Sequence, residues 1–426
     1  MRPTRLIPAL LLLAACSSPP LPYGAFVTGD LLPVERWAEE QSKEDENALA
    51  LYLNTEATCK LLRGERTAAR RLFLAAGRIM GNWATAGGQV VSAIVGSESS
   101  KEYRGDPYEV AMNSIYAGLL FWMDGEFDTC RAGAKAAMLA DSDSEKKEYQ
   151  SDFTLLYWIA GRMSRRMGLD SDAEDYFKLA REAQQKAVAA GSRGEATNPL
   201  LEQPDHGNVV LFVDVGMGPR KFADGPHGSV ARFKSAGSRE AYAVVTVDGQ
   251  RLGRTHILAD LDFQAMTRGG RYMDGILEGK AIFKTASTVA GAVVLNEALH
   301  MDNKKAAGAA AIVGGSLLLL GLLTSAEADT RHWAVLPSTV QLLTLDLPPG
   351  RHELRIEFCD AGGFALPALT QNWHVDVSGK VDEVYYFRSI PGLDRLPEPG
   401  PERALESRPD AGKANNASTP PGDDDR

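Results

Sequence analysis

The sequence predicts an α+β protein, with helical repeats in its first half and then an antiparallel β-sandwich-like domain that carries a Gly/Ala-rich helical hairpin insertion. Residues 45–190 have helical periodicity interrupted by glycine turns. Residues 208–391 instead form short apolar or alternating runs between Gly and Pro turns. A chain of 426 residues also exceeds what one hydrophobic core usually organises, which predicts two domains.

The first 15 residues have the composition of an export signal. Arg2 and Arg5 precede an apolar stretch at 6–13 that is too short to cross a bilayer, since a spanning helix needs about 20 apolar residues. The Leu-Ala-Ala-Cys sequence that ends at Cys16 resembles the lipobox of bacterial lipoproteins. That resemblance implies cleavage before Cys16 and diacylation of its thiol, so that 16–44 are the lipidated cysteine and its tether. The alternative is an ordinary secretory signal with a chance cysteine.

Location and partners follow from the flanking residues and the charge. Ser17 is not the acidic residue that retains many lipoproteins at the inner membrane, so the resemblance implies a periplasm-facing anchor in the outer membrane. The net charge of −10 argues against a nucleic-acid partner. Residues 392–426 are proline-rich and charged, which predicts a disordered tail.

Glycine turns divide the helical half into similar units. Aligning the turns at Gly64, Gly125 and Gly168 brings small residues into register, with Phe73 and Phe177 at the same offset in the first and third units. This arrangement resembles the tetratricopeptide repeat, in which small residues allow two helices to approach closely. The spacings of the turns differ from a 34-residue tandem array. A plain helical bundle with incidental alanine spacing is therefore the alternative.

In this register one concave face carries several polar and aromatic residues. Repeat proteins of this kind bind peptides or proteins along such a face. The residues predicted there are Asn54, Thr58, Met112, Trp122, Trp158, Arg162 and Arg165. They form no repeated basic clamp, and two tryptophans with a methionine favour an apolar groove for a protein partner. The alternative is that these aromatic residues pack against the following domain.

The second half contains six predicted strands. They are 209–213, 241–247, 340–345, 352–358, 373–377 and 381–387. A turn is expected at Asp248-Gly249, and chain reversals are expected at 348–350 and 378–379. Segments 245–255 and 347–354 resemble two halves of the small surface-layer-type PEGA sandwich, separated here by about 80 residues. A helical insertion at about 260–335, within an immunoglobulin-like or transthyretin-like sandwich, explains that separation.

The insertion has an unusual composition. Residues 306–326 contain no charged side chain, and 285–295 form a second Gly/Ala-rich apolar run. The length permits a transmembrane helix, and closely spaced small residues suit helix–helix contact. Two interpretations remain open, a buried helical hairpin and a hairpin at 285–326 that contacts the membrane.

Motifs for catalysis, metals and cofactors are absent from the sequence. No nucleophile elbow or HExxH motif occurs, and the seven histidines have no metal-ligand spacing. Asp260 and Asp262 are expected at a solvated strand edge, and 216–221 as a turn rather than a phosphate-binding loop. Cys59, Cys130 and Cys359 are expected as buried thiols, although an exported chain permits one disulfide among them.

Three motifs resemble those of a family of uncharacterised bacterial lipoproteins. They are Y-x-G-x-x-[FY]-E at 103–109, G-x-x-P-x-K at 216–221 and A-D-T-R-x-W-x-x-L-P at 328–337. Members have tetratricopeptide-like helices followed by a β-rich domain, and the resemblance implies no activity. Within the third motif, Asp329, Arg331 and Trp333 are expected on one face of a strand. An ion pair under the indole would then form a structural latch that joins the insertion to the sandwich.

These observations favour a lipid-anchored envelope protein that acts as a protein-binding or assembly scaffold without catalytic activity. No cofactor, metal or small-molecule substrate is expected. Two alternatives remain, a membrane-active or pore-associated component that uses the apolar hairpin, and an envelope enzyme with an unrecognised site.

Overall fold

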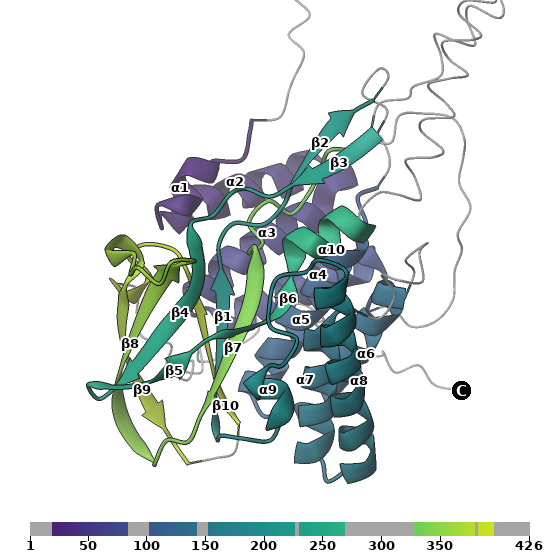
Figure 1. The fold of residues 1–426 in the computed structure, drawn as a ribbon. Helices are drawn as coiled ribbons and strands as arrows, with labels where there is room; N and C mark the ends of the chain where they lie inside the picture. The colour runs from purple at the N-terminus through teal and green to yellow at the C-terminus, as the bar shows by residue number, and fades with distance from the viewer. Residues whose placement is uncertain are drawn as a thin grey trace, which may run out of the picture.

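The computed structural model describes residues 19–83, 102–142, 152–225, 230–268, 328–379 and 382–395. These residues form a mixed α+β structure, with a layer of helices beside several sheets (Figure 1). Cys16, the hairpin at 285–326 and the tail beyond 395 lie outside the described residues. None of the described helices is long and apolar enough to cross a membrane.

Most helices of the first half pair through tight turns. The paired helices are α3 (Leu49–Leu62) with α4 (Arg66–Met80), α5 (Pro107–Met123) with α6 (Phe127–Ser142), and α7 (Thr154–Arg166) with α8 (Asp170–Ala189). Before them come α1 (Tyr23–Val27) and α2 (Leu31–Glu44), and after them the short α9 (Pro199–Glu202). The turn glycines Gly64, Gly125 and Gly168 have φ values of 75°, 78° and 73°. This left-handed conformation favours glycine, which is why these residues end each first helix.

The small residues within the pairs have unequal roles. A Cβ atom placed on Gly161 of α7 would lie 2.6 Å from the ring of Phe177 in α8. At Gly118 of α5 the nearest atom to such a Cβ would be the Cys130 carbonyl oxygen, at 3.5 Å. Of these two equivalent glycines, Gly161 is therefore the one that a Cβ atom would force apart from the neighbouring helix.

The strands of the second half form three sheets. They are β1 (Val209–Val215), β2 (Arg220–Asp224), β3 (Val230–Lys234), β4 (Glu240–Val247), β5 (Gln250–Arg254), β6 (His256–Asp260), β7 (Thr339–Leu345), β8 (Gly350–Asp360), β9 (Gln371–Val377) and β10 (Glu383–Arg388). The strand orders are β10-β1-β7-β6, β5-β4-β8-β9 and the β2–β3 hairpin. Helix α10 (Leu261–Arg268) follows β6.

Several strand connections differ from the sequence expectation. The turn at Asp248-Gly249 does join paired strands β4 and β5, and both residues have positive φ. The segments 348–350 and 378–379, however, cross between the two four-stranded sheets instead of closing hairpins. As a result β10 pairs with β1 in parallel, an exception to the expected antiparallel arrangement. Turn composition identifies a reversal, but the partner of each strand is set by distant packing.

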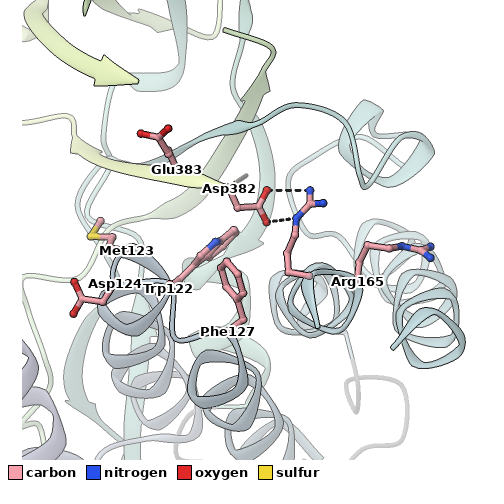
Figure 2. A pocket seen from close by; sticks show the side chains of 9 residues that line it. Trp122, Met123, Asp124, Phe127, Arg165, Asp382 and Glu383 are labelled. Atoms are coloured by element: carbon pink, nitrogen blue, oxygen red, sulfur yellow. Dashed lines mark hydrogen bonds and ion pairs between the residues drawn. The ribbon is translucent and has the colours of Figure 1, made fainter. Parts of the chain in front are cut away.

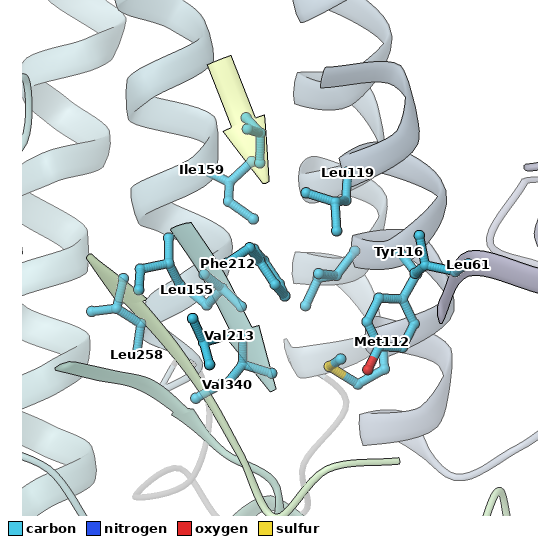
Figure 3. Packing of buried hydrophobic residues seen from close by; sticks show 14 of the residues in the cluster. Leu61, Met112, Tyr116, Leu119, Leu155, Ile159, Phe212, Val213, Leu258 and Val340 are labelled. Carbon is cyan, nitrogen blue, oxygen red and sulfur yellow. The ribbon is translucent and has the colours of Figure 1, made fainter. Parts of the chain in front are cut away.

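The central strands β1 and β7 are buried along their whole length because they are covered on both faces. Asp214 of β1 accepts a hydrogen bond from Tyr116 of α5. Because side chains alternate along a strand, every second side chain of β1, counted from Asp214, faces the helices. On the opposite face Gln341 of β7 hydrogen-bonds Thr255 and the carbonyl of Ala241. Figure 3 shows apolar side chains of β1, β7 and the helices in one cluster. The helical and sheet parts therefore share a continuous core.

The two PEGA-like segments lie in one sheet. Strand β4 pairs with β8 in antiparallel register, with Val247 opposite Leu354. Residues that are far apart in sequence thus become neighbours in one sheet.

Candidate functional site

The predicted concave face is closed rather than open. Six of its seven residues, all except Arg165, are buried: Asn54, Thr58, Met112, Trp122, Trp158 and Arg162. Asn54 accepts a hydrogen bond from Asn113 at 2.7 Å, and the indole N–H of Trp158 donates to the carbonyl of Leu200 at 3.0 Å. The face therefore packs within the chain itself, which corrects the expectation of a free groove along it.

Arg162 binds the sheet part of the chain. Its guanidinium donates to Asp382 at 2.6 Å, and to the carbonyls of Pro204, His206 and Gly207 at 2.7–3.0 Å. Arg166 donates to the other oxygen of Asp382 at 2.8 Å. The side chains of Arg162 and Asp382 are fully buried. Buried charges need such complete pairing, so Arg162 is a structural residue that holds α7 to the start of β10.

An open cleft of about 610 Å³ lies beside this ion pair. Three separate segments form it, namely the α5–α6 turn, the end of α7 and the start of β10 (Figure 2). Its lining residues are Trp122, Met123, Asp124, Gly125, Phe127, Arg165, Arg166, Asp382 and Glu383. The α5–α6 side supplies mostly apolar surface and the other two segments supply charge. The cleft thus brings together Trp122 and Arg165, two residues predicted from sequence, at a site whose other members were not predicted.

Most charged groups of the cleft have partners within the chain. Arg165 pairs with Asp170 at 2.8 Å and Asp205 at 3.0 Å, and with Glu174. The hydrogen bond to Asp170 is the largest contribution that raises the pKa of Arg165. The indole N–H of Trp122, by contrast, has no acceptor among the described residues although it is buried. An unpaired buried donor of this kind is uncommon in folded proteins.

The three family-like motifs meet at a second place, around Glu109 at the start of α5. One carboxylate oxygen accepts hydrogen bonds from the Tyr103 hydroxyl and the Asp106 backbone N–H, both at 2.7 Å. The other accepts from the backbone N–H of Trp333 at 2.5 Å. Burial, followed by the charge of Asp106, raises the pKa of Glu109 to about 7.

The middle motif joins this cluster through Lys221. Its ammonium group donates to Asp106 at 2.8 Å. Burial lowers the pKa of Lys221, but the charges of Asp106 and Glu109 more than offset this, and the pKa is raised overall. Gly218 of the same motif donates its N–H to the Leu336 carbonyl at 2.8 Å. The three motifs therefore form one junction, the Glu109 cluster, which holds the helices, β2 and the segment before β7 together.

The predicted latch exists in a different form. Asp329 and Arg331 form an ion pair at 2.7 Å, but the segment is not a strand, and the guanidinium lies over Tyr103 rather than Trp333. Trp333 is buried against Phe73 and Tyr116 of the helical layer. Residues 329–333 are thus tied to the helices, and Glu109 accepts the hydrogen bond of the Trp333 N–H there.

Asp260 and Asp262 are buried rather than solvated, which corrects the sequence expectation. Arg193 donates its backbone N–H and its Nε to Asp260 at 2.8 and 2.9 Å. Asp262 accepts from Ser235 at 2.7 Å and from Ser338 at 2.8 Å. Burial raises the pKa of Asp262. Asp260 ends β6 and Asp262 lies in α10, so the two do not share a strand as expected. Arg193, which lies in a loop, contacts both carboxylates and brings them together.

Within the described ranges, no group of His, Cys, Asp and Glu side chains has a geometry that could hold a metal ion. Searches against protein-family models, curated proteins and solved structures found no match to this chain. The site must accordingly be interpreted from its own geometry.

Proposed function

We propose that the chain is a lipid-anchored envelope scaffold of the outer membrane, facing the periplasm, that binds a protein partner in the cleft beside Trp122. The cleft carries this proposal. It is an open cleft where surface from three segments converges, and Arg165, one of the residues predicted for partner binding, keeps accessible surface there beside the buried Trp122. We further infer that the helical pairs form a tetratricopeptide-like array and that the two four-stranded sheets form a sandwich. The three motifs favour membership of the lipoprotein family that they resemble.

The chemistry of the cleft indicates the kind of segment it binds. Phe127 and Met123 offer apolar contact, and Trp122 lies beneath them in the wall of the cleft. Asp124 already pairs with Arg70 at 2.6 Å, and Arg166 with Asp382. An extended peptide with an apolar side chain fits these groups better than a strongly charged ligand.

The enzyme alternative gains no support from the carboxylates with raised pKa. Glu109 and Asp214 are both fully buried and neither lines the cleft. Their shifts follow from burial, as structural networks also produce. The membrane-active alternative depends on 285–326, outside the described residues.

Site-specific photocrosslinking in intact cells tests the partner site. A photoreactive residue at Phe127 should give one discrete protein adduct. The same residue at Leu179, which is 42% exposed on α8 and does not line the cleft, should give none. Filling the cleft with Asp124→Trp should remove the Phe127 adduct while the protein stays folded. Equal adducts at both positions, or an adduct that survives Asp124→Trp, would contradict the proposal.

The anchor has its own test. Cys16→Ser should abolish lipid labelling and leave the chain soluble or in its precursor form. A Cys16→Ser chain that remains lipid-labelled in the outer membrane would overturn the anchor proposal.

A further inference from the structure

The β2–β3 hairpin has one face packed on the body of the protein. Lys221 points inward, where its ammonium group meets Asp106 at 2.8 Å. Phe233 points to the same side and meets the ring of Tyr108 edge-on, with 5.8 Å between centroids. Side chains alternate along a strand, so the neighbouring residues lie on the opposite face.

The opposite, outer face of the hairpin is basic and aromatic. Arg220 pairs in register with Lys234, and Phe222 with Arg232, which places all four side chains on this face. The ammonium group of Lys234 lies 5.4 Å from the centre of the Phe222 ring. Asp224 is the only acidic residue of the two strands and pairs with Arg232 at 3.0 Å. A local excess of positive charge thus occurs in a chain with net charge −10.

The start of the described chain lies against this outer face. The guanidinium of Arg220 lies 3.5 Å from the centre of the Tyr23 ring in α1. Just upstream, the Pro19 carbonyl accepts a hydrogen bond from the indole of Trp37 at 2.8 Å. Three residues of chain reach at most about 11 Å, so Cys16 lies within that distance of Pro19. A tether of this length allows the hairpin to approach a membrane at the anchor to within the Debye length, about 8 Å at physiological ionic strength, where its charges act on the lipid surface.

We propose that the outer face of the β2–β3 hairpin binds the phosphate groups of anionic lipids in the membrane that holds Cys16. The inference rests on the proposed lipid anchor and adds a second, electrostatic contact that sets the orientation of the protein. Arg and Lys pair with phosphate, and each contributes about fivefold to binding at an anionic surface. An aromatic ring such as Phe222 suits the interfacial region beside them. The contact directs the hairpin toward the bilayer and the opposite end of the helical layer away from it (Figure 1).

Two label positions can measure this orientation. Ala223 lies in β2 on the side of Lys221, is exposed and uncharged, and therefore reports the depth of the hairpin without removing an outer-face residue. Met167 is 39% exposed in the α7–α8 turn. The other end of α7 lies near the hairpin, because α10 connects the two. Gln264 of α10 hydrogen-bonds Asp152, just before α7. Asp262 of α10 accepts a hydrogen bond from Ser235, just after β3. The 13 residues of α7 then separate the two positions by about 20 Å.

The experiment uses the full lipidated chain in vesicles that contain a headgroup-located quencher. Ala223→Cys or Met167→Cys carries the fluorophore, and the buried native thiols are spared. In equimolar phosphatidylcholine and phosphatidylglycerol, quenching at position 223 should exceed that at 167 several-fold. The excess should fall in phosphatidylcholine alone and at high salt.

Charge reversal supplies the matched control. The double variant Arg232→Glu/Lys234→Glu should remove the excess quenching at 223. Lys135→Glu/Lys178→Glu makes the same change of net charge on exposed helical positions and should leave it intact. Equal quenching at both label positions, or equal loss in both double variants, would overturn the hairpin proposal. A chain without lipid by mass spectrometry would overturn the anchor instead, so the two failures are distinguishable.

Discussion

The backbone N–H of Trp333 donates a hydrogen bond to the carboxylate of Glu109, 224 residues earlier in the chain, over 2.5 Å. Glu109 is also the acceptor for Tyr103, and Lys221 lies close enough to lower its pKa. Three segments that are remote in sequence therefore depend on one buried carboxylate. Its protonation state should affect how strongly the helices, β2 and the segment before β7 hold together.

Stability should depend on pH through Glu109. Its pKa is raised from the usual 4.5 to about 7 in the folded state by burial and by Asp106. The folded state then binds more protons than the unfolded chain between these values. The stabilisation from this group is fully present below about pH 4.5 and is lost as the pH rises through 7. The free energy of unfolding should fall by up to about 3 kcal/mol over this range. Urea unfolding at about pH 6 and about pH 8 should show the decrease.

The Glu109→Gln variant is the control for this effect, because glutamine cannot ionise. The other charged groups of the cluster, Lys221, Asp106 and Arg331, remain in place. The variant should have a smaller change of unfolding free energy between the two pH values than the unchanged protein. If both proteins show the same change, Glu109 is not its source.

Two glycines at equivalent positions of the helical pairs should respond differently to alanine. Gly161→Ala places a methyl group 2.6 Å from the Phe177 ring and should destabilise the protein by about 1–3 kcal/mol. Gly118→Ala meets only an ordinary contact at 3.5 Å, and the higher helix propensity of alanine should make it neutral or slightly stabilising. Thermal unfolding of both variants measures the difference. A larger loss at Gly118 would contradict the packing described here.

Local signals in the sequence predicted local structure well. The apolar run at 209–213 predicted β1 because a strand covered on both faces has apolar residues throughout. Glycine turns predicted the helical pairs for a similar reason, since positive φ values favour that residue type. Both signals depend on neighbours in the chain.

Long-range relationships could not be predicted in this way. Periodicity placed Trp158 and Arg162 on one helix face but does not encode what covers that face. Arg162 and Asp382 lie 220 residues apart, and no feature of either sequence segment identifies the other. Likewise the segment 348–350 has the composition of a turn between paired strands, but the strand that follows it belongs to another sheet. The cleft could be predicted only in part, because three remote segments build it.

The three described cysteines should be free thiols that react only after unfolding. Cys59, Cys130 and Cys359 are all buried and form no disulfide with one another. Burial raises the pKa of Cys59 and Cys130, which suppresses the reactive thiolate. Thiol titration should detect almost none of them in the native protein and all three in denaturant. Rapid native reaction, or a disulfide found by mass spectrometry, would contradict this.

The contributions of Arg162 and Asp382 to the free energy of unfolding should be strongly coupled. Asp382→Ala leaves the guanidinium of Arg162 buried without its carboxylate and should destabilise the protein by about 3–5 kcal/mol. Arg162→Met leaves Asp382 with Arg166 as its remaining partner and should cost less. In the double variant no buried charge is left unpaired, so its loss of unfolding free energy should be smaller than the sum of the single losses. Urea denaturation of the four proteins measures the coupling energy. Strictly additive losses would show that the two residues act independently and that α7 is held to β10 by other contacts.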